Sequence, residues 1–187
     1  MQTMKALRQS IRKQRQSIST PNRKKFAKKL LSQVQKLSNF QKKQKIAIYL
    51  PNDGEIDTKY IKNFLENRGF SIYLPILFGK SLKFAKVGKK FRKNQFGINE
   101  PISSHVLNAN KMNIIFMPLV GFDQNKNRIG MGGGFYDRTL EFKKRLQNYK
   151  NPKLYGLAFD CQKVDELYVQ PWDVSLDAVI TPTRIYQ

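Results

Sequence analysis

The amino-acid sequence predicts a single-domain α/β fold, a three-layer α/β/α sandwich with a largely parallel, Rossmann-like sheet. Apolar runs of strand length alternate with amphipathic helical stretches, and this alternation is typical of parallel α/β proteins. The most apolar run, "NIIFMPLVGF" at residues 113–122, is typical of a strand buried on both faces. The length of 187 residues suits one domain, and no internal repeat or low-complexity linker divides residues 1–187.

The N-terminal part predicts two helices. Residues 4–18 carry an apolar stripe beside a basic one, and the basic stripe consists of Lys5, Arg8, Arg12 and Arg15. This basic N-terminal helix, within residues 1–18, is expected to cover a phosphate site or a nucleic acid, with a solvated face as the alternative. The second helix should have Thr20 as its cap and Pro21 at its first position.

The alternation continues to the C-terminus. Asp57 and Gly69 are the expected start and stop of a third helix. In order, we expect a strand at 45–51, a helix at 57–69, a strand at 70–77, an antiparallel excursion at 78–88, an irregular segment at 89–110, the strand at 113–122, a helix at 135–149, and strands at 154–159 and 178–182. Ligands of such sheets bind beyond the carboxyl ends of the strands. Polar stretches fall there: "LPNDGEID", "NRIGMGGGFYDRTL" and "PWDVSLD".

Composition narrows the function. The net charge of +22 favours polyanionic partners, and the alternative is a set of ordinary solvated lysines. One cysteine and one histidine exclude disulfides and zinc sites built from Cys and His clusters, and nothing near Cys161 supports a catalytic role. The polar N-terminus has no apolar leader, and the longest apolar run is too short to span a bilayer. We therefore expect a cytoplasmic protein without membrane contact.

The stretch "NRIGMGGGFYDRTL" predicts a phosphate site. Glycines let backbone N–H groups approach an anion, and the following helix adds its N-terminal dipole. Arg128 could pair with phosphate oxygens, and Asp137 could hold magnesium. The stretch is neither a G-x-x-x-x-G-K-[ST] loop nor a G-x-G-x-x-G tied to a first βαβ unit. A tight structural turn is the alternative.

Two further loops carry candidate ligands. Glu55 could pair with adjacent N–H donors of a ring such as an aminopyrimidinone, or could merely favour the start of the next helix. Trp172 is expected in the core. Asp173 could complete a metal site with Asp137, or could be a turn residue.

The residues now define a resemblance. "FMPLVGFDQNKNRIGMGGGFYDRTL" closely resembles the signature of 5-formyltetrahydrofolate cyclo-ligases, also called 5,10-methenyltetrahydrofolate synthetases. The similarity extends through "ALRQSIRKQR", "YLPNDGEIDT", "FGINEP", "GLAFDCQ" and "PWDVSLDAVITP". It implies an ATP- and Mg²⁺-dependent conversion of 5-formyltetrahydrofolate to 5,10-methenyltetrahydrofolate. In the family mechanism the formyl oxygen takes the γ-phosphoryl group, the ring closes, and ADP and phosphate are released.

The resemblance also implies roles for individual residues. Arg128 and Tyr136 would be catalytic, and Asp137 and Asp173 would hold Mg²⁺. ATP would contact Lys5, Arg8, Arg128, Gly130, Gly132, Gly133, Gly134, Phe135 and Tyr136. The folate, possibly polyglutamylated, would contact Leu50, Glu55, Gly132 and Phe135. Two positions depart from the family pattern, because Gly133 stands where many members have lysine and Met4 stands where a lysine often precedes the arginine matching Arg8.

Two other functions remain as alternatives. A nucleic-acid-binding module would use the basic first helix, but no nucleic-acid motif occurs and the glycine stretch would have no role. A non-catalytic nucleotide-binding relative would not need both Asp137 and Asp173. We therefore expect a monomeric enzyme with no specific nucleic-acid partner.

Overall fold

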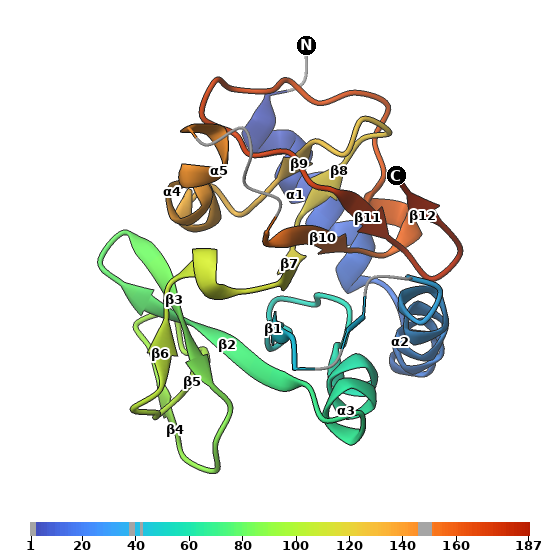
Figure 1. Cartoon of the computed structure of the whole chain (residues 1–187). Helices are drawn as coiled ribbons and strands as arrows, with labels where there is room; N and C mark the ends of the chain where they lie inside the picture. Colours follow the sequence, from blue (N-terminus) through green and yellow to red (C-terminus); the bar gives the residue numbers. More distant parts are fainter. Residues whose placement is uncertain (1–2, 38–39, 42, 146–150) are drawn as a thin grey trace.

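A computed structural model describes residues 3–37, 40–41, 43–145 and 151–187. Figure 1 shows a central twisted sheet of eight strands in the order β12-β11-β10-β7-β1-β2-β3-β6. The strands are β1 (Lys45–Ala47), β2 (Ser71–Phe78), β3 (Ser81–Lys86), β6 (Val106–Leu107), β7 (Ile114–Pro118), β10 (Lys153–Leu157), β11 (Ala178–Ile180) and β12 (Ile185–Tyr186). The inner strands from β11 to β2 run parallel, and the strands at both edges are antiparallel. The predicted sandwich with a largely parallel sheet is confirmed.

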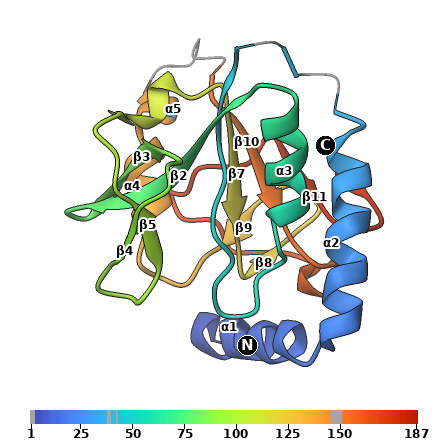
Figure 2. The ribbon, with the colours of Figure 1, turned by 90° about the horizontal axis from the view of Figure 1, so that it is seen from below.

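Helices cover both faces of the sheet. On one face pack α2 (Thr20–Val34) and α3 (Lys59–Asn67), and on the other pack the short helices α4 (Phe135–Leu140) and α5 (Phe142–Arg145). Two apolar clusters form the core, because alternate strand residues point to opposite faces: Ile114 and Phe116 belong to one cluster, Ile115 and Met117 to the other. The first helix, α1 (Met4–Gln16), lies across one end of the sheet (Figure 2).

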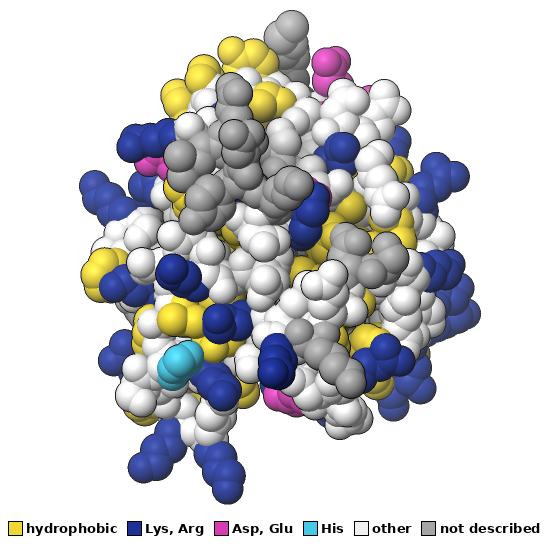
Figure 3. All heavy atoms as spheres, viewed as in Figure 1, with side chains coloured by type: hydrophobic (Ala, Val, Ile, Leu, Met, Phe, Trp, Pro, Cys, Tyr) yellow, Lys and Arg dark blue, Asp and Glu magenta, His cyan; other side chains and the backbone are white. Residues whose placement is uncertain are grey.

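Short elements complete the described structure. Two small antiparallel pairs are β4 (Phe91–Lys93) with β5 (Asn99–Pro101) and β8 (Gly121–Phe122) with β9 (Arg128–Ile129). Two 3₁₀ turns are η1 (Ala109–Lys111) and η2 (Asp160–Gln162). Within the described residues, no helix is long and apolar enough to cross a bilayer. Lys and Arg side chains are spread over the face seen in Figure 3, with few acidic ones between them.

Several predicted boundaries were wrong for local reasons. The strand predicted at 113–122 ends at Pro118, because the backbone then turns into the separate β8–β9 pair. The strand predicted at 45–51 is shorter in the structure, because only β1 (Lys45–Ala47) pairs with the neighbouring strands β2 and β7. The helix predicted at 135–149 divides at Glu141 into α4 and α5, and residues 146–150 lie outside the described ranges. The segment predicted to be irregular, 89–110, contains the β4–β5 hairpin, β6 and η1.

Helix ends also differ from expectation by one or two residues. Ser19, rather than Thr20, is the cap of α2, and α1 ends at Gln16. Thr58 caps α3, while Asp57 accepts a hydrogen bond from the Lys59 N–H at 2.8 Å. The stop at Gly69 is confirmed, since its positive φ of 77° ends the helix in the left-handed region.

Candidate functional site

One large cavity lies over the carboxyl ends of the parallel strands. Its volume is about 700 Å³. From β1 the chain continues to β2 on one side of the sheet, and from β7 it continues to β10 on the other side. The strand order therefore reverses between the neighbouring strands β1 and β7. Ligand sites of open α/β sheets lie at this point. The loop after β1, the glycine stretch after β9, the β4–β5 hairpin, the start of α1 and the segment 168–173 line the cavity.

The cavity brings together nearly all residues singled out in the sequence. Its lining includes Arg8, Leu50, Glu55, Arg128, Gly130, Gly132, Gly133, Gly134, Phe135, Tyr136, Asp137 and Asp173. Lys5 is exposed on α1 and does not line the cavity. Cys161 also lies outside the lining, and burial raises the pKa of its thiol.

The glycine loop is tightly folded. Gly132 and Gly134 have φ of 96° and 62°, which L side chains rarely adopt. A Cβ on Gly133 would lie 2.9 Å from the Phe135 ring. Arg138 fastens the loop by donating to the Gly133 carbonyl and, at 2.6 Å, to the Lys80 carbonyl. The loop therefore presents bare backbone to the cavity just before the N-terminus of α4.

Arg128 and Asp137 form an ion pair at the base of this loop. Arg128 Nη2 donates to Asp137 Oδ1 at 2.8 Å, and the side chains are only 5% and 19% exposed. The buried Arg128 Nε has no hydrogen-bond partner among the described residues. A buried donor without an acceptor is costly, so this nitrogen is ready for an oxygen ligand.

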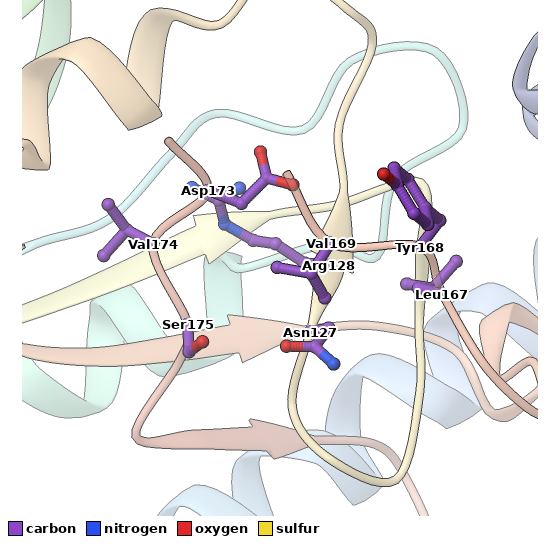
Figure 4. A pocket seen from close by; sticks show the side chains of 8 residues that line it. All are labelled: Asn127, Arg128, Leu167, Tyr168, Val169, Asp173, Val174 and Ser175. Carbon is purple, nitrogen blue, oxygen red and sulfur yellow. The ribbon is translucent and has the colours of Figure 1, made fainter. Parts of the chain in front are cut away.

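A small side pocket lies next to the large cavity. Figure 4 shows Arg128 and Asp173 lining it, together with Asn127, Leu167, Tyr168, Val169, Val174 and Ser175. Arg128, Tyr168 and Asp173 line the large cavity as well. The side pocket holds about 10 Å³, which is water-sized, so it is an annex of the cavity and no site for a larger ligand.

The two aspartates fit a magnesium site only in part. Both line the cavity, but Asp137 is paired with Arg128, and Asp173 accepts from the Gln170 N–H at 2.8 Å. No group of three or more His, Cys, Asp or Glu side chains gathers in the described part of the chain. Mg²⁺ commonly takes one or two carboxylates and completes its shell with water and phosphate oxygens. The donor set therefore suits a metal that arrives with a phosphate ligand.

Glu55 lies in a strained turn at the other side of the cavity. Asp53 and Gly54 have φ of 48° and 74°. The Asn52 N–H donates to Glu55 Oε2 at 3.0 Å. Burial raises the pKa of the Glu55 carboxyl to about 7, the Asn52 hydrogen bond and Arg15 oppose the rise, and Asp53 adds to it.

Two tyrosines, Tyr49 and Tyr136, lie close enough to Glu55 for its charge to affect their pKa values. Burial raises the pKa of the Tyr49 and Tyr136 hydroxyls above the ordinary value, and the negative charge of Glu55 adds to both rises. Arg128 opposes the rise at Tyr136. Tyr136 therefore stays protonated and can donate a hydrogen bond between Glu55 and the glycine loop.

Helix α1 holds both sides of the cavity. Arg8 Nε donates to the Gly130 carbonyl at 2.9 Å. Arg12 forms two hydrogen bonds with the Asp53 carboxylate, at 2.7 and 3.0 Å. Arg15 is fully buried and donates to the carboxylate and carbonyl of Asp53 and to the Leu119 carbonyl. We call Arg12, Arg15 and Asp53 the α1 clamp.

Sequence reasoning did not predict the role of Asp53 in the α1 clamp, nor that Trp172, Phe96 and Glu100 line the cavity. Asp53 was passed over, although "NDG" is a sequence typical of positive φ. Trp172 was expected in the core, but it is 65% exposed and lines the cavity. Phe96 and Glu100, from the segment expected to be irregular, line it too.

The fold and cavity define a class: a Rossmann-like α/β protein with a large cavity at the switch point of its sheet. The model of the 5-formyltetrahydrofolate cyclo-ligase family matches residues 1–182. The chain is 38% identical over 184 residues to a 5-formyltetrahydrofolate cyclo-ligase of Haemophilus influenzae, covering 94% of this chain and 95% of the relative. It is 38% identical over 149 residues to the Escherichia coli K12 protein of the same name, covering 76% and 80%.

Solved structures agree. A 5,10-methenyltetrahydrofolate synthetase of Aquifex aeolicus superposes with a TM-score of 0.82 at 26% identity, covering 97% of this chain and 90% of that one. The Mycoplasma pneumoniae synthetase gives 0.75 at 26% identity, covering 95% and 98%. The chain belongs to the 5-formyltetrahydrofolate cyclo-ligase family. The family activity is that of a ligase in folate one-carbon metabolism, with ATP as co-substrate.

Proposed function

We propose that this chain catalyses the ATP-dependent cyclisation of 5-formyltetrahydrofolate to 5,10-methenyltetrahydrofolate, releasing ADP and phosphate. One observation carries the proposal: a single cavity is lined by both the glycine loop and the Glu55 turn, to which the resemblance to the family assigns ATP and folate. Two ligands that must react with each other need one shared cavity.

The chemistry assigns each side of the cavity a task. The formyl oxygen on N5 attacks the γ-phosphorus, and the bond from that phosphorus to the ADP oxygen breaks. The other folate nitrogen, N10, then attacks the activated formyl carbon and loses its proton, and phosphate leaves as the ring closes. An amide-like oxygen is a poor leaving group, and phosphorylation converts it into a good one. The protein has to align the ligands and stabilise phosphate charge.

On the ATP side, the loop from Gly130 to Gly134 would supply backbone N–H groups, and the positive end of α4 would face the phosphates. Arg128 would place its unpartnered Nε against a phosphate oxygen. Tyr136, protonated at neutral pH, would donate to the transferring group. Arg8 lines the cavity and would contact ATP, while its Nε supports the loop through the Gly130 carbonyl. Lys5 lies outside the lining and would act on ATP only through its charge.

Asp137 and Asp173 would hold Mg²⁺ brought in with ATP. When bound, the ion would supply charge neutralisation across the phosphates. Asp137 would then share its carboxylate between the metal and Arg128, which fixes both groups relative to the glycine loop.

On the folate side, Glu55 would accept hydrogen bonds from the N–H donors of the pteridine ring. Leu50, Phe135 and Gly132 would form the apolar walls around that ring. With a pKa of about 7, the Glu55 carboxyl is partly protonated near neutral pH. A ligand with adjacent N–H donors would stabilise the carboxylate form and so favour loss of this proton.

The remaining parts of the proposal concern partners. The enzyme acts as a monomer in the cytoplasm, and its positive charge favours polyglutamylated folates without specific binding of nucleic acid. Membrane binding forms no part of its activity.

The deciding experiment mixes purified protein with ATP, magnesium and 5-formyltetrahydrofolate and follows the absorbance of the methenyl product. Growth that requires all three additions supports the proposal. The proposal would be contradicted if the folded wild type gave no methenyl product and were indistinguishable in this assay from the Asp137→Asn variant. Absence of product, together with tight binding of a generic oligonucleotide at physiological ionic strength, would favour a nucleic-acid-binding module instead.

A further inference from the structure

Exposed apolar side chains gather at the mouth of the cavity. Eight large hydrophobic side chains are exposed among the described residues, and half of them line the cavity: Phe96, Met131, Tyr168 and Trp172. Exposed apolar surface is unfavourable in water, and its concentration at one opening indicates a surface that a ligand covers. The most distinctive member is Trp172, at 65% exposed.

The turn that carries Trp172 is held rigidly. The Asp173 N–H donates to the Gln170 carbonyl at 3.0 Å, and the Gln170 N–H donates back to Asp173 Oδ2 at 2.8 Å. Pro171 occupies the second position of this β-turn, where its fixed φ is favourable. The Lys144 ammonium donates to the Pro171 carbonyl. The indole is therefore presented to the cavity by a fastened turn.

The neighbours of Trp172 indicate which ligand it faces. Asp173 follows it directly and lines both the cavity and the side pocket with Arg128. On the proposed function, these two residues contact the phosphates and their metal. The base of a nucleotide is joined to its phosphates through one ribose, so an exposed indole next to Asp173 is placed to face the base. The pteridine ring has its own partners at Glu55.

We propose that Trp172 stacks on the adenine ring of ATP and that residues 168–173 form the base-binding edge of the cavity. The inference rests on the proposed function and adds to it the residue that recognises the nucleoside half of ATP. A base stacked on an aromatic side chain contributes about 1–3 kcal/mol. Stacking acts equally in the bound ground state and the transition state, so it lowers KM for ATP and leaves kcat unchanged.

The test uses the fact that the sequence contains a single tryptophan. Without folate, a non-hydrolysable ATP analogue should quench and shift the indole fluorescence, whereas inorganic triphosphate should not. By calorimetry, the wild type should bind the analogue more tightly than inorganic triphosphate. Trp172→Ala should lose most of this preference, and Trp172→Phe should keep much of it.

Kinetics supply the second readout. Trp172→Ala should raise KM for ATP by roughly 5- to 150-fold, the range equivalent to the stacking contribution. Its kcat and its KM for 5-formyltetrahydrofolate should not change. Phe78→Ala is the matched control, because Phe78 is 57% exposed but does not line the cavity.

Three results would overturn the inference in an active enzyme. They are an unchanged KM for ATP in Trp172→Ala, an increase confined to the KM for folate, and equal fluorescence responses to the analogue and to triphosphate. Failure of the proposed function is distinguishable, because the wild type itself would then form no methenyl product.

Discussion

At the scale of single residues, Glu55 combines a partly buried position with one hydrogen bond from the Asn52 backbone to its carboxylate. Glu55→Gln keeps the size of the side chain but loses a charge-assisted hydrogen bond to the pteridine, at a cost of about 1.5–3 kcal/mol. We expect KM for 5-formyltetrahydrofolate to rise far more than KM for ATP in steady-state assays. Equal increases for both substrates would make Glu55 a structural residue.

The raised pKa of Glu55 also predicts how stability depends on pH. The ordinary pKa is 4.5 and the folded-state pKa is about 7, so the folded protein holds the proton more tightly than the unfolded chain. This contribution is fully present below pH 4.5 and is lost as the pH rises through about 7, with an upper limit of about 3 kcal/mol. Urea unfolding should show this decline in the ligand-free wild type. The decline should be absent from Glu55→Gln. If the free energy of unfolding depended on pH in the same way in both proteins, Glu55 would not be the group whose pKa is raised.

Asp137 predicts a different pattern. Asp137→Asn keeps one acceptor for Arg128 but is a much weaker magnesium ligand. We expect a folded variant whose turnover falls by about two orders of magnitude or more, on the order of 3 kcal/mol in the barrier. Asp173→Asn should show a smaller defect that excess magnesium partly rescues. Magnesium titrations of both variants distinguish the roles: an unchanged magnesium requirement in Asp137→Asn would leave it only the ion pair with Arg128.

At the scale of elements, the α1 clamp predicts where stability and substrate binding meet. Asp53→Ala would leave the fully buried Arg15 without its carboxylate, which should destabilise the protein by about 3 kcal/mol. Because the same residue shapes the turn before Glu55, KM for folate should rise as well. Urea unfolding and steady-state kinetics measure the two effects.

Matched variants separate the buried half of the clamp from the exposed half. Arg12 is 38% exposed, so Arg12→Gln should cost under about 1 kcal/mol. Asp53→Asn tolerates the positive φ and retains an acceptor, so it should lie between Arg12→Gln and Asp53→Ala. A cost for Arg12→Gln as large as that for Asp53→Ala would show that the exposed pair, rather than Arg15, carries the clamp.

The sequence predicted the elements better than their junctions. Strands such as β7 were recognisable because burial on both faces leaves a continuous apolar run. The end of β7 was not, because it depends on the pairing of Gly121 and Phe122 with β9. Most candidate site residues meet in one cavity because they follow strands whose carboxyl ends share an edge. The clamp and the exposed Trp172 depend on contacts between distant segments, which no local pattern encodes.

At the scale of the whole molecule, the net charge of +22 is a field rather than a single patch on the face seen in Figure 3. A pentaglutamate form of the substrate should therefore bind more tightly than the monoglutamate form, and salt should reduce the difference. Titrations at low and high ionic strength measure this difference. A gap independent of salt would indicate a specific contact instead, and no gap at all would leave the charge without a role in folate binding.

The position of α1 has a consequence for how the chain acquires its structure. This helix precedes its partners in the sequence, which are Asp53, Leu119, Gly121, Gly130 and the residues around η2. Protein chains are synthesised from the N-terminus, so α1 is made before these partners. Arg15 can reach all of its native acceptors only after Leu119 has been added, and the contacts of α1 with η2 form only after residues 160–162 have been added. The contacts that hold α1 over the cavity are therefore all long-range, and they become complete only once the chain extends through η2.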